Sequence, residues 1–164
     1  MASEAISSSI MIIGAVLGAA VLITAILPAI FSAGDTFGTV SSSAEQKLKT
    51  DFRIVNTYTD GTVVKVWMKN VGSNRISEND LYKADVFLGI DKEVGTNSYD
   101  RYVHSSVGGS KTFSDDLEQA YWTIGETVEV TITLSADSIV DGDVVSFTFT
   151  LPNSVRRSVT FSLT

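Results

Sequence analysis

The sequence contains one long apolar run, from Ile10 to Phe31, in which Thr24 is the only polar side chain and no residue is charged. Every Lys and Arg lies at or beyond Lys47. In a helix, the 22 residues of this run span about 33 Å, against roughly 30 Å for the hydrocarbon core of a bilayer. A helix that is apolar on every side must be surrounded by lipid or by other protein. The run therefore predicts a helix that crosses a membrane or lies at the centre of an assembly.

A cleaved secretory signal peptide is the alternative for this segment. Such a signal has a basic start, a shorter apolar centre and a small-residue cleavage site. Residues 1–9 contain Glu4 and no basic residue, and the apolar run is longer than the centre of a signal. We therefore favour a helix that is retained.

The apolar run carries small residues at positions four apart. Gly14 is followed by Gly18, and Ala15 by Ala19, so the two pairs form neighbouring stripes on the helix surface. Small residues let helix backbones approach closely where lipid is as apolar as the side chains. A plain lipid anchor stays open, because Gly and Ala are frequent in membrane helices generally. The expected helix-packing residues are Gly14, Ala15, Leu17, Gly18, Ala19, Val21, Leu22 and Ile26.

Pro28 lies near the end of the apolar run. Proline has no backbone N–H, so the carbonyl of Thr24 lacks its usual helical partner. We therefore expect a helix kink at Pro28.

After the apolar run, the chain is either a flexible Ser/Gly linker or a continuation of the helix. Phe37, Val40, Ala44 and Leu48 recur at intervals of three and four, which is a helical stripe. The Gly and Ser residues between them weaken the helical pattern. We expect one long helix that reaches about Leu48, with Gly34 as the point at which a break would fall.

From residue 51 onward, the pattern changes to short runs rich in Val, Ile, Thr, Phe and Tyr, separated by turn residues. This pattern is typical of an all-β sandwich or barrel. The predicted fold class is α+β, with a long N-terminal hydrophobic helix in residues 1–50 and an all-β immunoglobulin-like sandwich in residues 51–164. The expected strands cover residues 52–58, 63–69, 84–90, 99–104, 127–134, 144–151 and 157–163.

Three turn signals support these strands. Asp60-Gly61 lies between the first two runs, where a tight hairpin requires positive φ. Asp141-Gly142 serves similarly before the run at 144–151, and Pro152-Asn153 follows that run. The last two runs are therefore expected to form a hairpin.

Alternating side chains indicate which face of the sheet is buried. In the run at 144–151, Val145, Phe147 and Phe149 alternate with largely polar residues, which predicts one apolar face. Large aromatic side chains elsewhere are interpreted as core fillers and not as a platform for stacking a ligand. The aromatic residues assigned to the core are Trp67, Phe87, Trp122, Phe147 and Phe161.

The charge of the chain excludes one class of partner. The formal net charge is −7 and the sequence pI is near 4.6. Nucleic-acid binding depends on clustered Lys and Arg, and the sequence has no such cluster. No nucleic-acid partner is expected. The absence of cysteine also excludes disulfides, thiolate metal sites and thiol nucleophiles.

Few residues offer catalytic or metal-binding chemistry. His104 is the only histidine, and nothing around it forms a nucleophile motif. Asp91 with Glu93, and Asp115 with Asp116, supply oxygen atoms but lack the spacing and glycine of a calcium loop. The sequence has no glycine-rich phosphate loop and no N-linked glycosylation sequon. We expect no enzyme activity, no cofactor and no metal.

An apolar helix followed by a β-sandwich resembles the subunits of the archaellum, the archaeal motility filament. The segment from Ile10 to Ile23, in which Gly and Ala interrupt aliphatic residues, looks like the hydrophobic segment of archaellins. The segments 43–56 and 63–72 are similar to the junction of helix and first strand in archaellins and in the accessory archaellum proteins called FlaG.

The archaellin resemblance implies a homopolymer at the cell surface, with helices bundled inside and β-domains outside. The helix would be inserted in the membrane before assembly, and other archaellum proteins would be partners. The alternative is a FlaG-type membrane-anchored accessory or stator protein whose sandwich binds a protein partner outside the membrane.

Two departures from archaellins bear on this choice. Archaellins are made with a basic leader, which here either lies outside this sequence or does not exist. The missing sequons favour the accessory protein, whereas the Gly/Ala stripe favours the filament. We favour the filament subunit.

Overall fold

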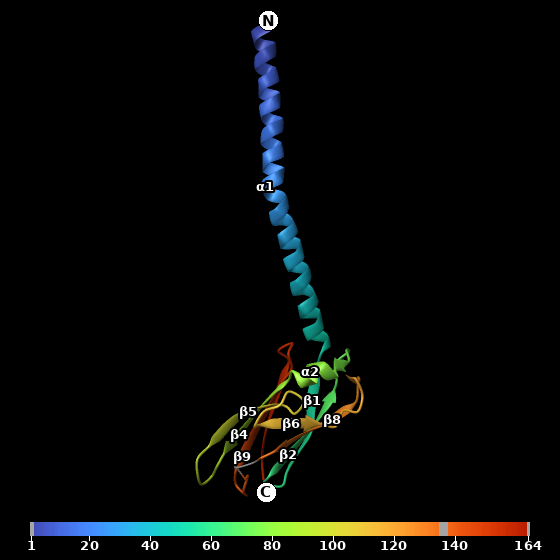
Figure 1. Cartoon of the computed structure of the whole chain (residues 1–164), viewed down its shortest axis with the longest axis vertical. Coiled ribbons are helices and arrows are strands. Elements are labelled where there is room, and N and C mark those ends of the chain that lie inside the picture. Colours follow the sequence, from blue (N-terminus) through green and yellow to red (C-terminus); the bar gives the residue numbers. More distant parts are fainter. Residues whose placement is uncertain (1, 135–137, 164) are drawn as a thin grey trace. The chain divides into compact units, whose positions relative to one another are not determined.

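The computed structural model describes residues 2–134 and 138–163 and consists of two compact units, residues 1–44 and 45–164 (Figure 1). The first unit is formed by most of helix α1 (Ala2–Lys49). The second unit contains the last residues of α1 together with all the strands, and is called the β-domain below.

Helix α1 runs without interruption to Lys49, which confirms the long helix. The break considered at Gly34 is wrong, because a glycine weakens a helix by only about 1 kcal/mol and removes no backbone donor. The hydroxyls of Thr36, Thr39 and Ser42 donate to carbonyls in the preceding turn at 2.8 to 3.0 Å. These polar side chains are thus satisfied within the helix. The helix continues through Pro28, and the kink there stays a prediction.

The end of α1 is held by the loop that follows strand β2. The carbonyl of Lys49 accepts hydrogen bonds from the backbone N–H groups of Ser73 (2.9 Å) and Asn74 (3.2 Å). A Cβ atom at Gly72 would lie 2.5 Å from the Lys49 carbonyl oxygen, so only glycine fits there. The backbone of this loop therefore supplies donors that a helix end otherwise lacks.

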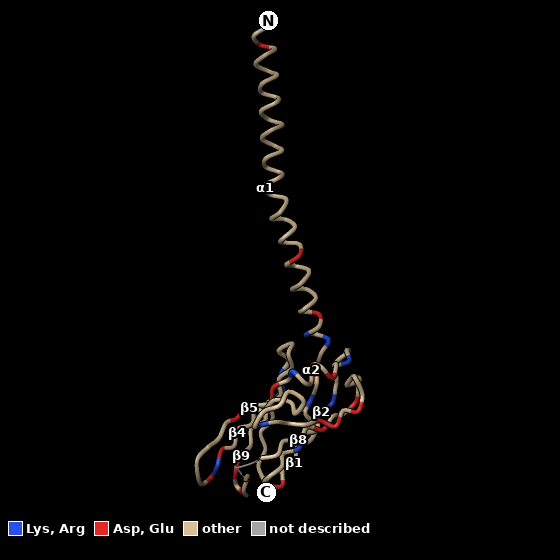
Figure 2. Tube along the Cα trace, in the orientation of Figure 1, with Lys and Arg blue, Asp and Glu red and all other residues tan. Residues whose placement is uncertain are grey.

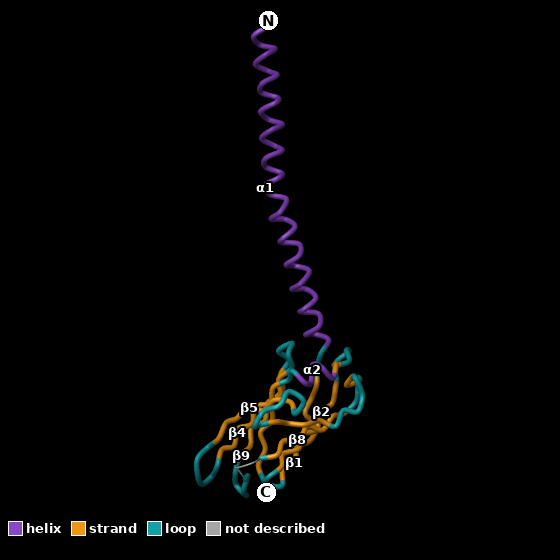
Figure 3. Tube along the Cα trace, viewed as in Figure 1, coloured by secondary structure: helices purple, strands orange, loops and turns teal. Residues whose placement is uncertain are grey.

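The described strands all lie in the β-domain (Figure 3), where eight of them form one sheet with the order β1-β2-β8-β6-β5-β4-β9-β10. Neighbouring strands are antiparallel except β5 and β6, which are parallel. The strands are β1 (Phe52–Thr59), β2 (Val63–Asn70), β4 (Asp85–Asp91), β5 (Ser98–His104), β6 (Thr112–Asp115), β8 (Thr127–Thr133), β9 (Val144–Thr150) and β10 (Arg156–Ser162). A second sheet pairs β3 (Ile76–Ser77) with β7 (Tyr121–Trp122), and α2 (Glu78–Tyr82) follows β3.

The sheet curls into a nearly closed sandwich, which confirms the predicted fold class. Its two edge strands, β1 and β10, approach each other, and Arg157 of β10 forms an ion pair with Asp51, just before β1. All seven predicted strands are present, with ends within one residue of those expected. The sequence pattern missed β3, α2, β6 and β7, because elements of two to five residues are too short to show a period.

The core lies between the inner faces of the sandwich and contains Val145, Phe147 and Phe149, as expected. Trp122 is also fully buried and donates its indole N–H to the carbonyl of Glu126 at 2.9 Å. Phe161 is half-buried and packs against the edge of the core.

Two aromatic residues were wrongly assigned to the core. Trp67 lies between buried Val66 and Met68, and Phe87 lies between buried Val86 and Leu88. Because side chains alternate along a strand, both aromatic residues lie on the outer face and are only half-buried. In these near-continuous apolar runs, aromatic character alone did not identify the inner face.

Candidate functional site: the apolar helix

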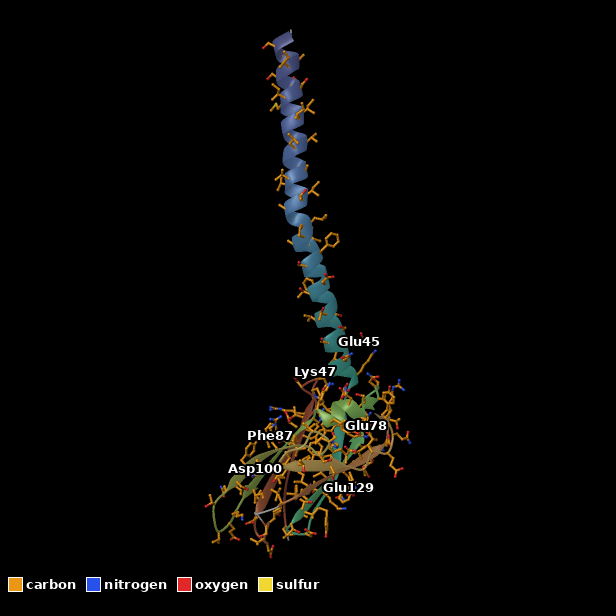
Figure 4. All side chains as sticks on the ribbon, in the orientation of Figure 1. Glu45, Lys47, Glu78, Phe87, Asp100 and Glu129 are labelled. Atoms are coloured by element: carbon orange, nitrogen blue, oxygen red, sulfur yellow. The ribbon has the colours of Figure 1, made fainter. Side chains whose placement is uncertain are left out.

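The apolar side chains of α1 have no cover within the chain. Among the large ones between Ile10 and Phe31, exposure ranges from 46% at Leu27 to 79% at Met11. They project from every side of the helix (Figure 4). Apolar surface of this extent, with no polar face, marks a site of contact with lipid or protein.

The glycines of α1 are also unexplained by contacts within the chain. An added Cβ at Gly14, Gly18, Gly34 or Gly38 would meet nothing within 4 Å. Each pair has the four-residue spacing that lets another helix approach closely. The first pair was expected from the sequence, whereas Gly34 and Gly38 were treated only as weak points of the helix. The same spacing rule, applied beyond the apolar run, would have found them.

By length and composition, α1 is able to cross a membrane. Its one polar side chain in the apolar run, Thr24, donates its hydroxyl to the carbonyl of Ala20 at 2.8 Å, so no polar side chain needs water. Lys and Arg appear only near the last turn of the helix (Figure 2). The eight expected packing residues all lie within the exposed apolar region, and their role in packing stays a prediction.

The contacts of His104 connect neighbouring elements of the β-domain. Its Nε2 lies 2.8 Å from Oδ2 of Asp115, and its ring stacks on Tyr82 with 4.5 Å between centroids. Its Nδ1 accepts the backbone N–H of Ser106 at 3.1 Å, and the Ser106 hydroxyl lies 2.6 Å from the same nitrogen. The histidine joins α2, β5 and β6.

Three of the four carboxylates considered as calcium ligands are engaged individually. Asp91 accepts the side-chain amide of Asn97, Asp115 contacts His104, and Asp116 accepts the backbone N–H of Glu129. Among the described residues, no group of three His, Cys, Asp or Glu side chains is arranged to hold a metal ion.

One ion pair on the outer face of the sheet perturbs its carboxylate. Lys65 Nζ donates to Glu129 Oε1 at 2.8 Å, and the Thr131 hydroxyl donates to the same oxygen at 3.1 Å. The hydrogen bond from Lys65 is the main reason that the pKa of Glu129 is lowered and the pKa of Lys65 is raised. This pair stabilises the pairing of β2 with β8 and offers no reactive group.

A sequence profile described as archaeal-type flagellin matches residues 2–161. The chain belongs to the archaeal-type flagellin family. This result confirms the resemblance inferred from the apolar segment and the helix–strand junction. Within the similar sequences, an uncharacterized protein of Archaeoglobus fulgidus is 30% identical over 166 residues, which cover 99% of both chains.

Solved structures share the fold of this archaeal-type flagellin. The archaeal flagellum of Methanospirillum hungatei strain JF1 matches with a TM-score of 0.68 and 18% identity, over 96% of this chain and 92% of that chain. The archaellum periplasmic stator protein FlaG of Sulfolobus acidocaldarius matches with a TM-score of 0.55 and 20% identity, over 68% of this chain and 99% of that chain. The flagellum match therefore includes most of the long helix, whereas the FlaG match leaves about a third of the chain uncovered.

Proposed function

We propose that the protein is a structural subunit of an archaellum filament, which polymerises through α1 and presents the β-domain on its outer surface. The observation that carries the proposal is the 22-residue apolar run, which is exposed on all sides in a member of the flagellin family. A bundle of such helices would give each one the apolar surroundings that a single chain lacks. The proposal includes no enzymatic activity, cofactor or metal.

The energy available from this packing is large. Burying half the side-chain surface of a 22-residue helix removes on the order of 800 Å² from water, which is worth about 20 kcal/mol before ordering costs. If subunits assemble from a membrane, lipid already covers the helix, and the gain comes from close packing instead. Residues that set the distance between helices should therefore control assembly.

The proposed packing surface combines the expected residues with the second glycine pair. At about 100° per residue, Gly34 lies roughly 200° around the helix axis from Gly14. The two glycine pairs therefore face nearly opposite sides and allow close neighbours on both. Repeated contacts between different faces build an open assembly and not a closed dimer. The surface comprises Gly14, Ala15, Leu17, Gly18, Ala19, Val21, Leu22, Ile26, Gly34 and Gly38, with Pro28 as the proposed kink.

The proposed route passes through the membrane and ends at the cell surface. The apolar run is long enough for the hydrocarbon core, and the hydroxyl of Thr24 is satisfied inside the helix. Helices then leave lipid for the bundle, where protein replaces it. The β-domain has a polar exterior, which suits it to the aqueous side.

Electron microscopy of the full-length native protein tests the proposal. We expect straight filaments with helical symmetry, and a reconstruction should contain densely packed helices at the centre and β-domains outside. Dispersed particles in detergent, under conditions that assemble other archaellins, would contradict it.

A FlaG-type accessory role is the second candidate. The fold match to FlaG, and to the stator complex of FlaF and FlaG of Sulfolobus acidocaldarius, supports it; the complex matches with a TM-score of 0.55 over 67% of this chain. In that role, α1 is an anchor and the β-domain binds another archaellum protein. A stoichiometric complex purified from archaeal membranes, without filaments, would favour this candidate.

A further inference from the structure

One patch on the β-domain, here called the basic face, presents two cations that have no carboxylate partner. Arg53 of β1 lies directly opposite Lys69 of β2, and both side chains are exposed. Like charges placed opposite each other across two strands destabilise the pair. In the described residues neither Arg53 nor Lys69 forms an ion pair, although other cations of the domain do. The arrangement calls for a negative group from outside the domain.

The basic face also has an apolar part. A bulge between Ile54 and Asn56 leaves Val55 without a cross-strand partner, and its side chain is 55% exposed. Trp67, two residues before Lys69 on the same outer face, is only half-buried. A surface that places exposed apolar groups beside unpaired cations has the composition of a protein-binding patch.

A second patch, here called the acidic tip, has the opposite charge. It is the turn between β4 and β5, where exposed Asp91 and Glu93 flank half-buried Lys92 and Val94 is 86% exposed, so the turn keeps an excess of one carboxylate. Two contacts hold Glu93 in place. Its backbone N–H donates to the Asp143 carboxylate at 3.1 Å, and its own carboxylate packs against Gly142, where any larger residue would collide with it. The acidic tip thus combines carboxylates with an apolar side chain, as the basic face combines cations with one.

The two patches lie at opposite ends of the β-domain. The basic face is at the start of β1, beside the loop that binds the carbonyl of Lys49. The acidic tip is at the end of β4, where Glu93 contacts Asp143 in the turn at 140–143. The hairpin between β1 and β2 lies at the same end, because Gly61 accepts the backbone N–H of Ile139. Figure 2 shows acidic residues at the hairpin tips of that far end, with a basic residue between them in the turn between β4 and β5. Within one copy, the two patches cannot meet.

We propose that the acidic tip of one copy docks on the basic face of a second copy. The proposal rests on the proposed function, because a contact between two different patches repeats head to tail and builds an open chain of subunits, as a filament requires. Glu93 and Asp91 would neutralise Arg53 and Lys69, and Val94 would cover Trp67 and Val55. A contact of this kind would join neighbouring β-domains independently of the packing of α1.

Charge reversal in the full-length chain tests the docking. The basic-face variant Arg53→Glu with Lys69→Glu, and the tip variant Asp91→Lys with Glu93→Lys, each place like charges at every contact. We expect each variant alone to raise the protein concentration needed for assembly by at least about tenfold. An equal mixture restores opposite charges at every contact and should assemble like the wild type. Lys83→Glu with Arg156→Glu changes the net charge as much as the basic-face variant and should have little effect.

Cross-linking tests the same contact without requiring filaments. The chain has no cysteine, so Val55→Cys and Val94→Cys introduce unique thiols. With a short bis-maleimide, a mixture of the two single variants should give dimers, and the double variant should give a ladder of multimers. The Val94→Cys variant alone should give almost none.

The outcomes separate the two proposals. Wild-type filaments with no ladder and no effect of charge reversal overturn the docking and leave the filament function intact. A ladder of cross-linked multimers without any filaments supports the docking and contradicts the filament function. Sensitivity of the basic face alone, with a tolerant acidic tip, means that the acidic tip is not what binds the basic face and overturns the docking.

Discussion

The helix and the β-domain differ in where their partners come from. In α1, every described side chain from Ser3 to Lys49 is exposed, so no apolar group is covered. In the β-domain, a continuous core is buried, and no buried side-chain polar atom of the described residues lacks a partner. The β-domain thus contains the contacts that fix its own structure, whereas the environment of the helix must be supplied by other molecules.

Buried polar groups illustrate how completely the β-domain is satisfied. Asn70 is fully buried and donates its amide to the carbonyls of Asn74 (3.0 Å) and Trp122 (3.1 Å). Asp143 is fully buried and accepts the backbone N–H groups of Glu93 (3.1 Å) and Val140 (3.0 Å). Such groups stabilise a fold only when all their partners are present. Asn70 and Asp143 are thus each the centre of a separate set of hydrogen bonds within the β-domain.

Removal of residues 1–44 should have the largest effect on assembly and the smallest on the fold of the β-domain. We expect residues 45–164 to be folded and soluble, with a melting temperature close to that of the β-domain in the full chain, because the core lies wholly within them. Filament assembly should be lost completely. Analytical ultracentrifugation and circular dichroism measure the two properties. Aggregation or unfolding of the shortened chain would show that the helix also stabilises the β-domain.

The substitution Gly18→Leu should separate the helix from its neighbours without harming the chain itself. An added Cβ atom at Gly18 meets nothing within 4 Å in the single chain, and leucine favours a helix over glycine by almost 1 kcal/mol. We expect assembly to fail, as seen by electron microscopy and pelleting, while the β-domain melts unchanged. Gly18→Ala, which keeps the residue small, should still assemble. Normal filaments of the leucine variant would exclude close packing at this position and would favour a plain anchor.

Two phenylalanines distinguish the inner from the outer face of the β-domain. Phe147→Ala leaves a cavity in the core and should lower the free energy of unfolding by about 3–5 kcal/mol. Phe87→Ala should cost clearly less, because Phe87 is half-buried and stacks on exposed Tyr99 with 6.2 Å between centroids. Urea unfolding of residues 45–164 measures both values. Equal losses would contradict the assignment of Phe87 to the outer face.

The sequence was sufficient to predict the helix and the main strands because both carry long, regular signals. The uncharged run from Ile10 to Phe31 predicts an apolar helix, and the alternation at Val145, Phe147 and Phe149 identifies a buried face. The faces of β2 and β4 were harder to assign because apolar residues point both ways. Trp67 and Phe87 therefore appeared to be core residues until strand pairing fixed which neighbours lie inside.

The candidate site was only partly predictable for a different reason. The spacing of Gly14 and Gly18 is visible within an apolar run, but Gly34 and Gly38 lie among Ser, Thr and Asp, where glycine usually indicates a loop. Only the continuous helix places them on a helix surface. The unpaired cations Arg53 and Lys69 are 16 residues apart in the sequence and meet through the register of β1 and β2, which includes a bulge that composition does not reveal.

The smallest expected effect concerns the ion pair between Lys65 and Glu129 on the outer face. The hydrogen bond from Lys65 lowers the pKa of Glu129 below its usual 4.5 in the folded state. A carboxyl with a lowered folded pKa stabilises the protein above its unfolded pKa, and this contribution is lost as the pH falls through the folded pKa. Both side chains are partly exposed, so Glu129→Gln should cost less than about 1 kcal/mol at pH 7.

The pH dependence of that difference is the sharper measurement. Urea unfolding of the wild type and of Glu129→Gln should give curves that differ at pH 7 and converge as the pH falls from 4.5 through the lowered folded pKa of Glu129. Glu118→Gln is the matched control, because Glu118 is exposed and has no ion pair among the described residues, and it should change little at any pH. A difference that persists undiminished at pH 3 would mean that the packing of the Glu129 side chain, and not its charge, stabilises the junction of β2 and β8.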